Sequence, residues 1–234
     1  SIHSEYFIPL LTNFENNFPL IETVVIYSAE LVNFKIDWEK IISNKALKFI
    51  QLNFFHSDQY YFDIKGEIKS SIEELKLINI SWEFVTILFP VERFPYLKNI
   101  YIEFVKYGLN LDLGEIIRRL NSFSQLASLT LKGFFYLSNE ELSFRFENLK
   151  FFHLDSSQGI IDLDHLLNCM PNLIELQLEG RAFGELKIHN PIGIRYLRLP
   201  YNFFWYNRDF INVIKNTPNL IQLTTKEYFY SPIQ

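Results

Sequence analysis

Few residues in this chain have the types and spacing that catalysis or metal binding requires. The histidines stand apart at positions 3, 56, 153, 165 and 189, and Cys169 is the single cysteine. Asp162, Asp164 and His165 can be drawn as a metal site, but three such residues at a helix start are explained more simply by capping and solvation. No glycine-rich phosphate loop, zinc-protease motif, nucleophile elbow or C-x-x-C pair occurs. We therefore expect no catalytic residue, no metal site and no cofactor, and a Cys169 side chain in the core.

The overall composition is that of a folded chain with a hydrophobic core. Hydrophobic residues make up 48% and charged residues 21% of the 234 positions. The net charge of −5 and the absence of a basic run argue against nucleic acid as a partner. No apolar run approaches the roughly 18 residues of a membrane span, and a single cysteine excludes an internal disulfide. We expect an intracellular protein, cytoplasmic or nuclear, without membrane contact.

One spacing of apolar residues recurs along almost the whole chain. In Leu173, Leu176 and Leu178 it reads L-x-x-L-x-L, and successive copies begin 21 to 29 residues apart. The nine copies begin at Ile21, Leu47, Ile72, Leu97, Leu126, Leu149, Leu173, Ile194 and Leu220. The last copy is degenerate, because Thr225 occupies its third apolar place. In three copies a proline stands two residues before the first apolar position, where it ends the preceding helix.

Segments of helical periodicity lie between these predicted strands. They are residues 81–89, 111–123, 138–141, 162–170 and 207–217. A strand followed by a helical return and a right-handed crossover gives parallel strands, and stacking joins the buried positions into one core. Because helices need more lateral room than strands, we expect an α/β solenoid, a horseshoe with a parallel concave β-sheet and helices on its convex side.

The repeats are expected to form a single domain. Residues 1–18 would form an N-terminal cap, about nine repeats would occupy residues 19–226, and residues 227–234 would form a C-terminal tail. Residues 183–188 match the strand pattern but leave no room for a helix on either side. We interpret them as an extra strand between tight turns, with an extended surface loop as the alternative.

The repeated pattern resembles that of the leucine-rich-repeat superfamily over about residues 20–226. Variable repeat length, helical returns and the sequence Met170-Pro171-Asn172-Leu173 are most similar to the repeat regions of F-box proteins. The resemblance implies a curved binding platform and a substrate receptor of a ubiquitin ligase. Two features depart from it. The Asn or Cys that the family places three residues beyond the strand is absent, and only about 20 residues precede the first repeat, so an adaptor-binding F-box would lie outside this chain.

The concave face is the candidate binding surface. Alternation sends the third, fifth and seventh positions of each repeat to that face, and large apolar side chains at several of them are typical of interfaces. Strand propensity and a phenylalanine-rich genome would also supply such residues. Asp155, Glu175, Glu179 and Glu185 form an acidic stretch that favours a basic partner segment. The expected partner-binding residues are Tyr27, Phe49, Tyr101, Phe151, His153, Asp155, Glu175, Glu179, Tyr196 and Arg198.

These observations predict a non-catalytic scaffold that holds another protein on its concave face. The resemblance adds the substrate-recognition part of an F-box type receptor, with a ubiquitin-ligase adaptor as a second partner through a segment outside this chain. Two alternatives stay open. One is a structural subunit of a larger complex. The other is a leucine-rich-repeat protein that activates GTPases, for which Arg118 and Arg119 on the helical back are the residues to check.

Overall fold

The protein is α/β, with parallel sheet strands and a few short helices. The computed structural model describes residues 14–28, 38–54, 69–88, 93–105, 111–136, 145–156, 167–180, 193–200 and 210–226. Two compact units divide the chain: unit 1 comprises Ser1–Gly108 and Ser122–Leu126, and unit 2 comprises Leu109–Asn121 and Ala127–Gln234. The helices that the structure describes are all too short to cross a membrane.

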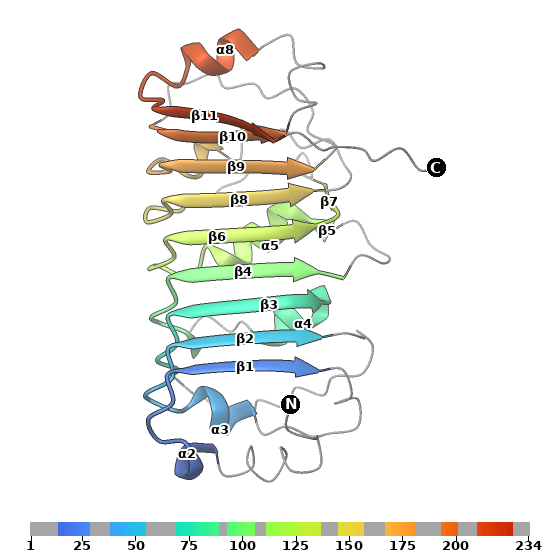
Figure 1. Ribbon diagram of the computed structural model, residues 1–234, viewed down its shortest axis with the longest axis vertical. Coiled ribbons are helices and arrows are strands. Elements are labelled where there is room, and N and C mark those ends of the chain that lie inside the picture. Colours follow the sequence, from blue (N-terminus) through green and yellow to red (C-terminus); the bar gives the residue numbers. More distant parts are fainter. Residues whose placement is uncertain are drawn as a thin grey trace, which may run out of the picture. The chain divides into compact units, whose positions relative to one another are not determined.

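Unit 1 carries four parallel strands whose order in the sheet follows the sequence (Figure 1). These strands are β1 (Thr23–Ser28), β2 (Phe49–Phe54), β3 (Glu74–Ile80) and β4 (Asn99–Phe104). Its described helices are α2 (Phe14–Asn17), α3 (Trp38–Ile42) and α4 (Trp82–Leu88). The rings of Phe54 and Phe84 meet edge to face at 5.2 Å, so α4 packs on the buried side of the sheet.

Unit 2 repeats this architecture with five parallel strands, again ordered as in the sequence (Figure 1). They are β6 (Ser128–Gly133), β8 (Phe151–Ser156), β9 (Glu175–Gly180), β10 (Tyr196–Pro200) and β11 (Gln222–Lys226). The fully described helices of unit 2 are α5 (Leu113–Leu120) and α8 (Phe210–Lys215). A second, two-stranded parallel sheet of β5 (Leu111–Asp112) and β7 (Phe135–Tyr136) was not predicted by the sequence pattern.

The apolar spacing locates all nine of these strands. Each begins two residues after the first apolar position of its copy, as β1 does after Ile21 and β11 after Leu220. Burial alternates along the strands, because the second and fourth residues face the core while the first, third and fifth face the other side. The pairing between neighbouring strands confirms the prediction that they are parallel. In β11 the pattern fails, since Leu223 occupies a core position and keeps 37% of its surface exposed.

One backbone arrangement recurs at the start of these strands. The carbonyl of Glu22 accepts hydrogen bonds from the amides of Lys48 and Phe49, at 2.9 and 3.0 Å. The same double acceptor recurs at Lys48, Glu73, Ala127, Lys150, Ile174 and Arg195. Each such carbonyl fixes the strand of the following repeat in register, so the repetition extends from the sequence to the hydrogen bonds.

The prolines that precede the repeats have a role beyond ending helices. The amide of Leu173 donates to the carbonyl of Met170 at 3.1 Å, and that of Leu220 donates to Thr217 at 3.1 Å. Pro171 therefore takes the second place of a hydrogen-bonded four-residue turn, a place for which its restricted φ angle is suited. The turn directs the chain from the helical return into the next strand.

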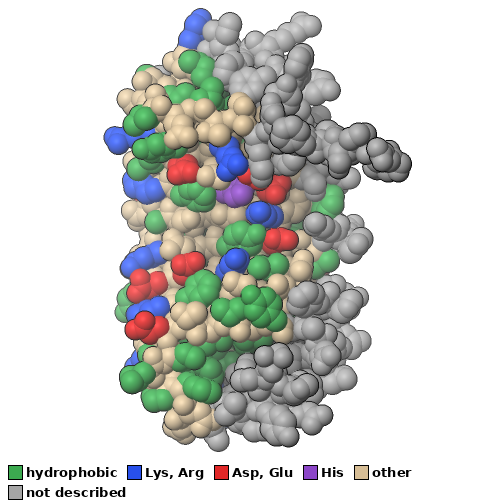
Figure 2. Space-filling view, in the orientation of Figure 1, with side chains coloured by type: hydrophobic (Ala, Val, Ile, Leu, Met, Phe, Trp, Pro, Cys, Tyr) green, Lys and Arg blue, Asp and Glu red, His purple; other side chains and the backbone are tan. Residues whose placement is uncertain are grey.

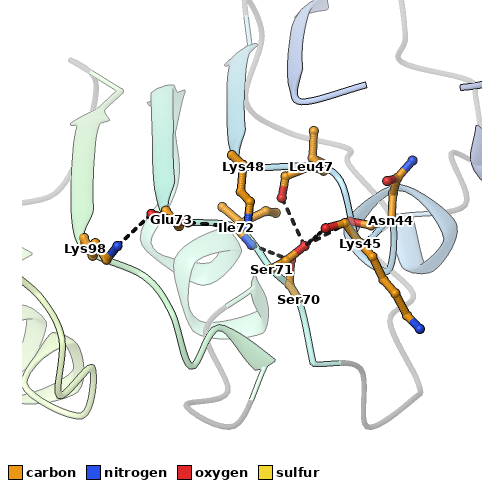
Figure 3. A network of polar contacts seen from close by, with 9 residues as sticks. All are labelled: Asn44, Lys45, Leu47, Lys48, Ser70, Ser71, Ile72, Glu73 and Lys98. Carbon is orange, nitrogen blue, oxygen red and sulfur yellow. Dashed lines mark hydrogen bonds and ion pairs between the residues drawn. The ribbon is translucent and has the colours of Figure 1, made fainter. Parts of the chain in front are cut away.

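Polar side chains join successive turns of unit 1 (Figure 3). The Ser71 hydroxyl donates to the carbonyl of Lys45 at 2.8 Å. Asn44 donates to the carbonyl of Phe18 at 3.0 Å and accepts from the amide of Ala46 at 2.9 Å. In unit 2 the amide of Asn172 donates to the carbonyl of Glu147 at 2.8 Å. These bonds satisfy turn backbone at the start of the strands.

A bulge in β3 turns one residue inward that alternation would send outward. The register with β4 shifts between Ile78 and Ile80, and Asn79 between them has a φ of 57°. Asparagine tolerates this left-handed backbone better than other non-glycine residues. The extra residue turns Ile80 into the core, where 2% of its surface is exposed.

Three of the predicted helices are found, each shorter than its segment. Within residues 81–89, 111–123 and 207–217 lie α4, α5 and α8. The Ser81 hydroxyl accepts from the amide of Phe84 at 3.3 Å, and the Asp112 carboxylate accepts from that of Gly114 at 2.8 Å, so both cap their helices. Of residues 162–170 the structure describes only 167–170. Residues 138–141, the extra strand at 183–188, most of the cap and the tail lie outside the described residues.

Candidate binding face of the parallel sheet

The first, third and fifth residues of the strands form one side of the sheet, here called the open face. Strand register sets the neighbours on that face: Lys76 lies beside Tyr101 in unit 1, and Glu175 lies beside Phe151 and Tyr196 in unit 2. Figure 2 shows apolar side chains gathered over the strands of unit 1 with acidic and basic ones among them, and a histidine with acidic and basic side chains over the strands of unit 2. Each unit therefore presents its own chemistry.

Unit 1 carries an aromatic patch, defined as Val25, Tyr27, Phe49, Ile78 and Tyr101. Tyr27 is 63% exposed and Val25 is 40% exposed, whereas the other three side chains are half-buried. Exposing large apolar side chains on the solvent side of a sheet is unfavourable, and covering them with another apolar surface is favourable. The patch is therefore suited to contact with another apolar surface.

Tyr101 is held in place by its neighbours on the same face. The Nζ atom of Lys76 lies 5.1 Å from the centre of its ring, a cation–π contact. Its hydroxyl donates to a carboxylate oxygen of Glu103 at 2.8 Å. The ring is thus fixed before any partner arrives, which lowers the entropy cost of binding to it.

Unit 2 carries a charged cluster, defined as Lys132, His153, Asp155, Glu179 and Arg198. The carboxylate of Glu179 lies 3.6 Å from Nε of Arg198 and 3.9 Å from Nε2 of His153. Lys132 and Asp155 approach to 3.9 Å. Two carboxylates of the predicted acidic stretch take part in these contacts. Glu179 is buried, with 7% of its surface exposed, and both it and Asp155 face cations of this chain.

The electrostatics of this cluster favour a neutral His153. Burial lowers the pKa of the imidazole below its usual 6.5, and this outweighs the opposing effect of the Glu179 carboxylate. Lys132 and Arg198 lower the same pKa further, while Asp155 raises it. At neutral pH the positive charge that faces Glu179 therefore belongs to Arg198.

A pocket of about 270 Å³ opens on the same face across β9, β10 and β11. It is lined by Glu175, Gln177, Tyr196, Leu197, Arg198, Gln222 and Thr224, and is called the β9–β11 pocket below. The Gln177 amide donates to the Glu175 carboxylate at 2.6 Å, and the Gln222 amide donates to the Thr224 hydroxyl at 3.1 Å. Its walls therefore offer one carboxylate, one guanidinium and one exposed aromatic ring.

The predicted binding residues separate into these two units. Tyr27, Phe49 and Tyr101 lie in unit 1, and the other seven lie in unit 2. Within unit 2 the structure brings His153, Glu179 and Arg198 into contact, and it places Glu175, Tyr196 and Arg198 around one pocket. Phe151 is half-buried beside Glu175. Glu185 lies outside the described residues.

Besides Gln177 and Leu197, sequence reasoning missed two pocket residues of the last strand, Gln222 and Thr224. They belong to the last copy of the pattern, which is hard to recognise because Thr225 stands at its third apolar position. The weak signal that remained is Leu220 with Leu223, whose spacing places Gln222 and Thr224 on the open face.

Comparison with known proteins gives no relative to place beside this geometry. No family model matches the chain, and no curated protein or solved structure matches it either. Within the described residues, no group of three or more His, Cys, Asp or Glu side chains is arranged to hold a metal ion. Cys169 is buried, as expected, and burial raises the pKa of its thiol. Asp162, Asp164 and His165 lie outside the described residues.

Proposed function

We propose that this protein is a leucine-rich-repeat solenoid that acts as a non-catalytic scaffold and binds another protein on the open face of its sheet. Two features support the architecture: parallel strands at every copy of the repeat, and the carbonyl of one repeat bonded to two amides of the next. A unit that cannot bury its apolar side alone gains a core by such stacking.

The exposure of Tyr27 and Val25 carries the proposal about binding. Both lie on the open face of unit 1 beside half-buried apolar neighbours, and together they leave a patch that no described element covers. Aromatic anchors surrounded by polar residues are typical of the centres of protein interfaces. Asn53 and Glu103 provide such polar surroundings in the same row as Tyr27.

The test is capture of partner proteins from the source cells by the full chain and by two double variants. We expect Val25→Ser with Tyr27→Ser to lose a partner that the wild type retains. The matched control is Leu20→Ser with Tyr96→Ser, which removes exposed apolar side chains from the turns of the same unit, 85% and 53% exposed. A partner lost equally from both variants, or retained by both, would contradict binding at the open face.

The F-box resemblance extends this proposal to a substrate receptor of a ubiquitin ligase. In that role the open face would bind the substrate, and an adaptor would bind a segment outside this chain. Joining this chain to an F-box module and measuring ubiquitylation of the captured partner tests the extension. The Val25→Ser with Tyr27→Ser variant provides its control.

A second candidate function, a structural subunit of a larger assembly, is favoured by the edge strand β11. Leu223 is 37% exposed at a core position, and Ile221 just before the strand is 67% exposed. An exposed edge strand is a template for pairing with another chain. Light scattering of the Ile221→Lys variant distinguishes this candidate, because loss of a self-associated state would favour it over the scaffold.

A further inference from the structure

We infer that the β9–β11 pocket receives an arginine or lysine side chain of the partner, held between the carboxylate of Glu175 and the ring of Tyr196. This inference rests on the proposed function, because it names the chemistry of the segment that the open face would bind.

Glu175 differs from the other two carboxylates that the structure describes on the open face of unit 2. Asp155 lies 3.9 Å from Lys132, and Glu179 lies 3.6 Å from Arg198. Among the described residues, no Lys, Arg or His lies within ion-pair distance of Glu175, whose carboxylate accepts only the neutral amide of Gln177. Among the described residues of unit 2, the uncompensated negative charge on this face therefore belongs to Glu175.

Tyr196 supplies the second contact that a cationic side chain needs. It is the register neighbour of Glu175, so the ring and the carboxylate stand side by side at the pocket. The ring is 39% exposed and makes no aromatic or cation–π contact with the residues that the structure describes. A guanidinium or ammonium group over its face would gain cation–π energy while pairing with the carboxylate.

One part of this combination, a cation over a tyrosine ring, already occurs in unit 1. There the Nζ atom of Lys76 lies over the ring of Tyr101, which is bonded to the carboxylate of Glu103. In the described part of unit 2 the ring and the carboxylate are present, but no cation lies between them. The nearby guanidinium of Arg198 does not take that place, because its Nε faces Glu179.

Arg198 also argues against an acidic ligand. The Glu179 carboxylate, which is buried beside it, offsets its charge. An incoming carboxylate would therefore meet both Glu175 and Glu179 within the same small area. A basic side chain meets the uncompensated Glu175, so charge complementarity favours it.

The test uses the isotope-labelled full chain and the blocked pentapeptide Ac-Gly-Gly-Arg-Gly-Gly-NH2, followed by the backbone amide signals of the pocket residues. We expect the arginine peptide to shift the signals of Gln177, Tyr196 and Thr224. Replacing arginine by citrulline removes the charge but keeps the shape, and we expect at least about fivefold weaker binding. The Glu175→Gln and Tyr196→Leu variants should weaken the arginine peptide to a similar degree.

The matched control is Glu74→Gln. Glu74 occupies the first position of β3 as Glu175 does of β9, it is exposed, and its loss changes the net charge by the same amount. Equal binding of arginine and citrulline peptides would overturn the inference, as would equal effects of Glu175→Gln and Glu74→Gln. Preference for a glutamate peptide, lost in Arg198→Met, would show an anion site instead.

Failure here can be told apart from failure of the proposed function. The pentapeptide reports only on the pocket in unit 2, whereas partner capture depends on the aromatic patch in unit 1. Suppose that the Val25→Ser with Tyr27→Ser variant loses the partner and that the pocket binds no arginine peptide. That result would support the scaffold function and contradict the basic side chain in the pocket.

Discussion

At the scale of single residues, Gly180 at the end of β9 lies where the structure leaves no room for a side chain. Its φ is 114°, and a Cβ atom there would overlap the carbonyl of Ser156, with the carbonyl carbon at 2.6 Å. We expect Gly180→Ala to lower the free energy of unfolding by about 2 kcal/mol or more, because φ strain and a backbone clash add. Urea unfolding measures this loss.

Gly193 is the matched control for that substitution. A Cβ atom at position 193 would come no closer than 4.0 Å to the carbonyl of Leu173, and no positive φ is needed there. Gly193→Ala should therefore change the free energy of unfolding by less than about 1 kcal/mol, with stabilisation as the expected sign. Equal losses at both positions would show that the contact with Ser156 is not the cause.

His153 makes the stability of the protein depend on pH. Burial keeps the pKa of the folded state below 6.5, so the unfolded chain takes up the proton first as the pH falls. The stability associated with neutral His153 is therefore complete above about pH 6.5 and is lost as the pH falls toward the folded pKa. Urea unfolding of the wild type and His153→Gln between pH 5 and 8 should show a steeper acid loss in the wild type. Parallel curves would contradict this assignment.

At the scale of elements, the short helix α5 depends on its N-terminal cap. Asp112 accepts from the amide of Gly114 at 2.8 Å and also pairs with Tyr136 through the β5–β7 sheet. We expect Asp112→Ala to lower the free energy of unfolding by about 1 kcal/mol, since an amide of the first turn loses its acceptor. Asp112→Asn, which keeps the acceptor oxygen, should lower the free energy of unfolding by no more than a few tenths of about 1 kcal/mol. Denaturant unfolding of the two variants provides the comparison, and equal losses would assign the effect to charge.

At the scale of the whole molecule, we expect a substitution in the core of one unit to destabilise mainly that unit. Leu77 of β3 and Leu154 of β8 occupy the same repeat position and are both fully buried, one in each unit. Each change to alanine should cost about 2–5 kcal/mol. In a nearest-neighbour array the loss of amide protection should be largest in the unit that carries the substitution. Hydrogen exchange measures this, and uniform loss in both units would indicate one cooperative core.

The sequence by itself determined where the strands lie and which of their residues are buried. Ile21 through Leu220 mark nine strands because the alternation of side chains along a strand is a local property of the backbone. The caps at Ser81 and Asp112 are equally local features, since each cap residue lies within three residues of the amide that donates to it. The conclusion that the strands are parallel followed from the spacing and helical returns between copies.

Only the tertiary structure decided which open-face residues act together. Glu179 looked like a solvated carboxylate, but Arg198 and His153 from neighbouring strands cover it. The pocket beside Glu175 likewise needs Gln222, which lies in a copy that the pattern barely marks. The physical reason is that neighbours across a sheet are set by the register between strands about twenty or more residues apart. No local periodicity encodes which side chains meet there, or which charges they leave without a partner.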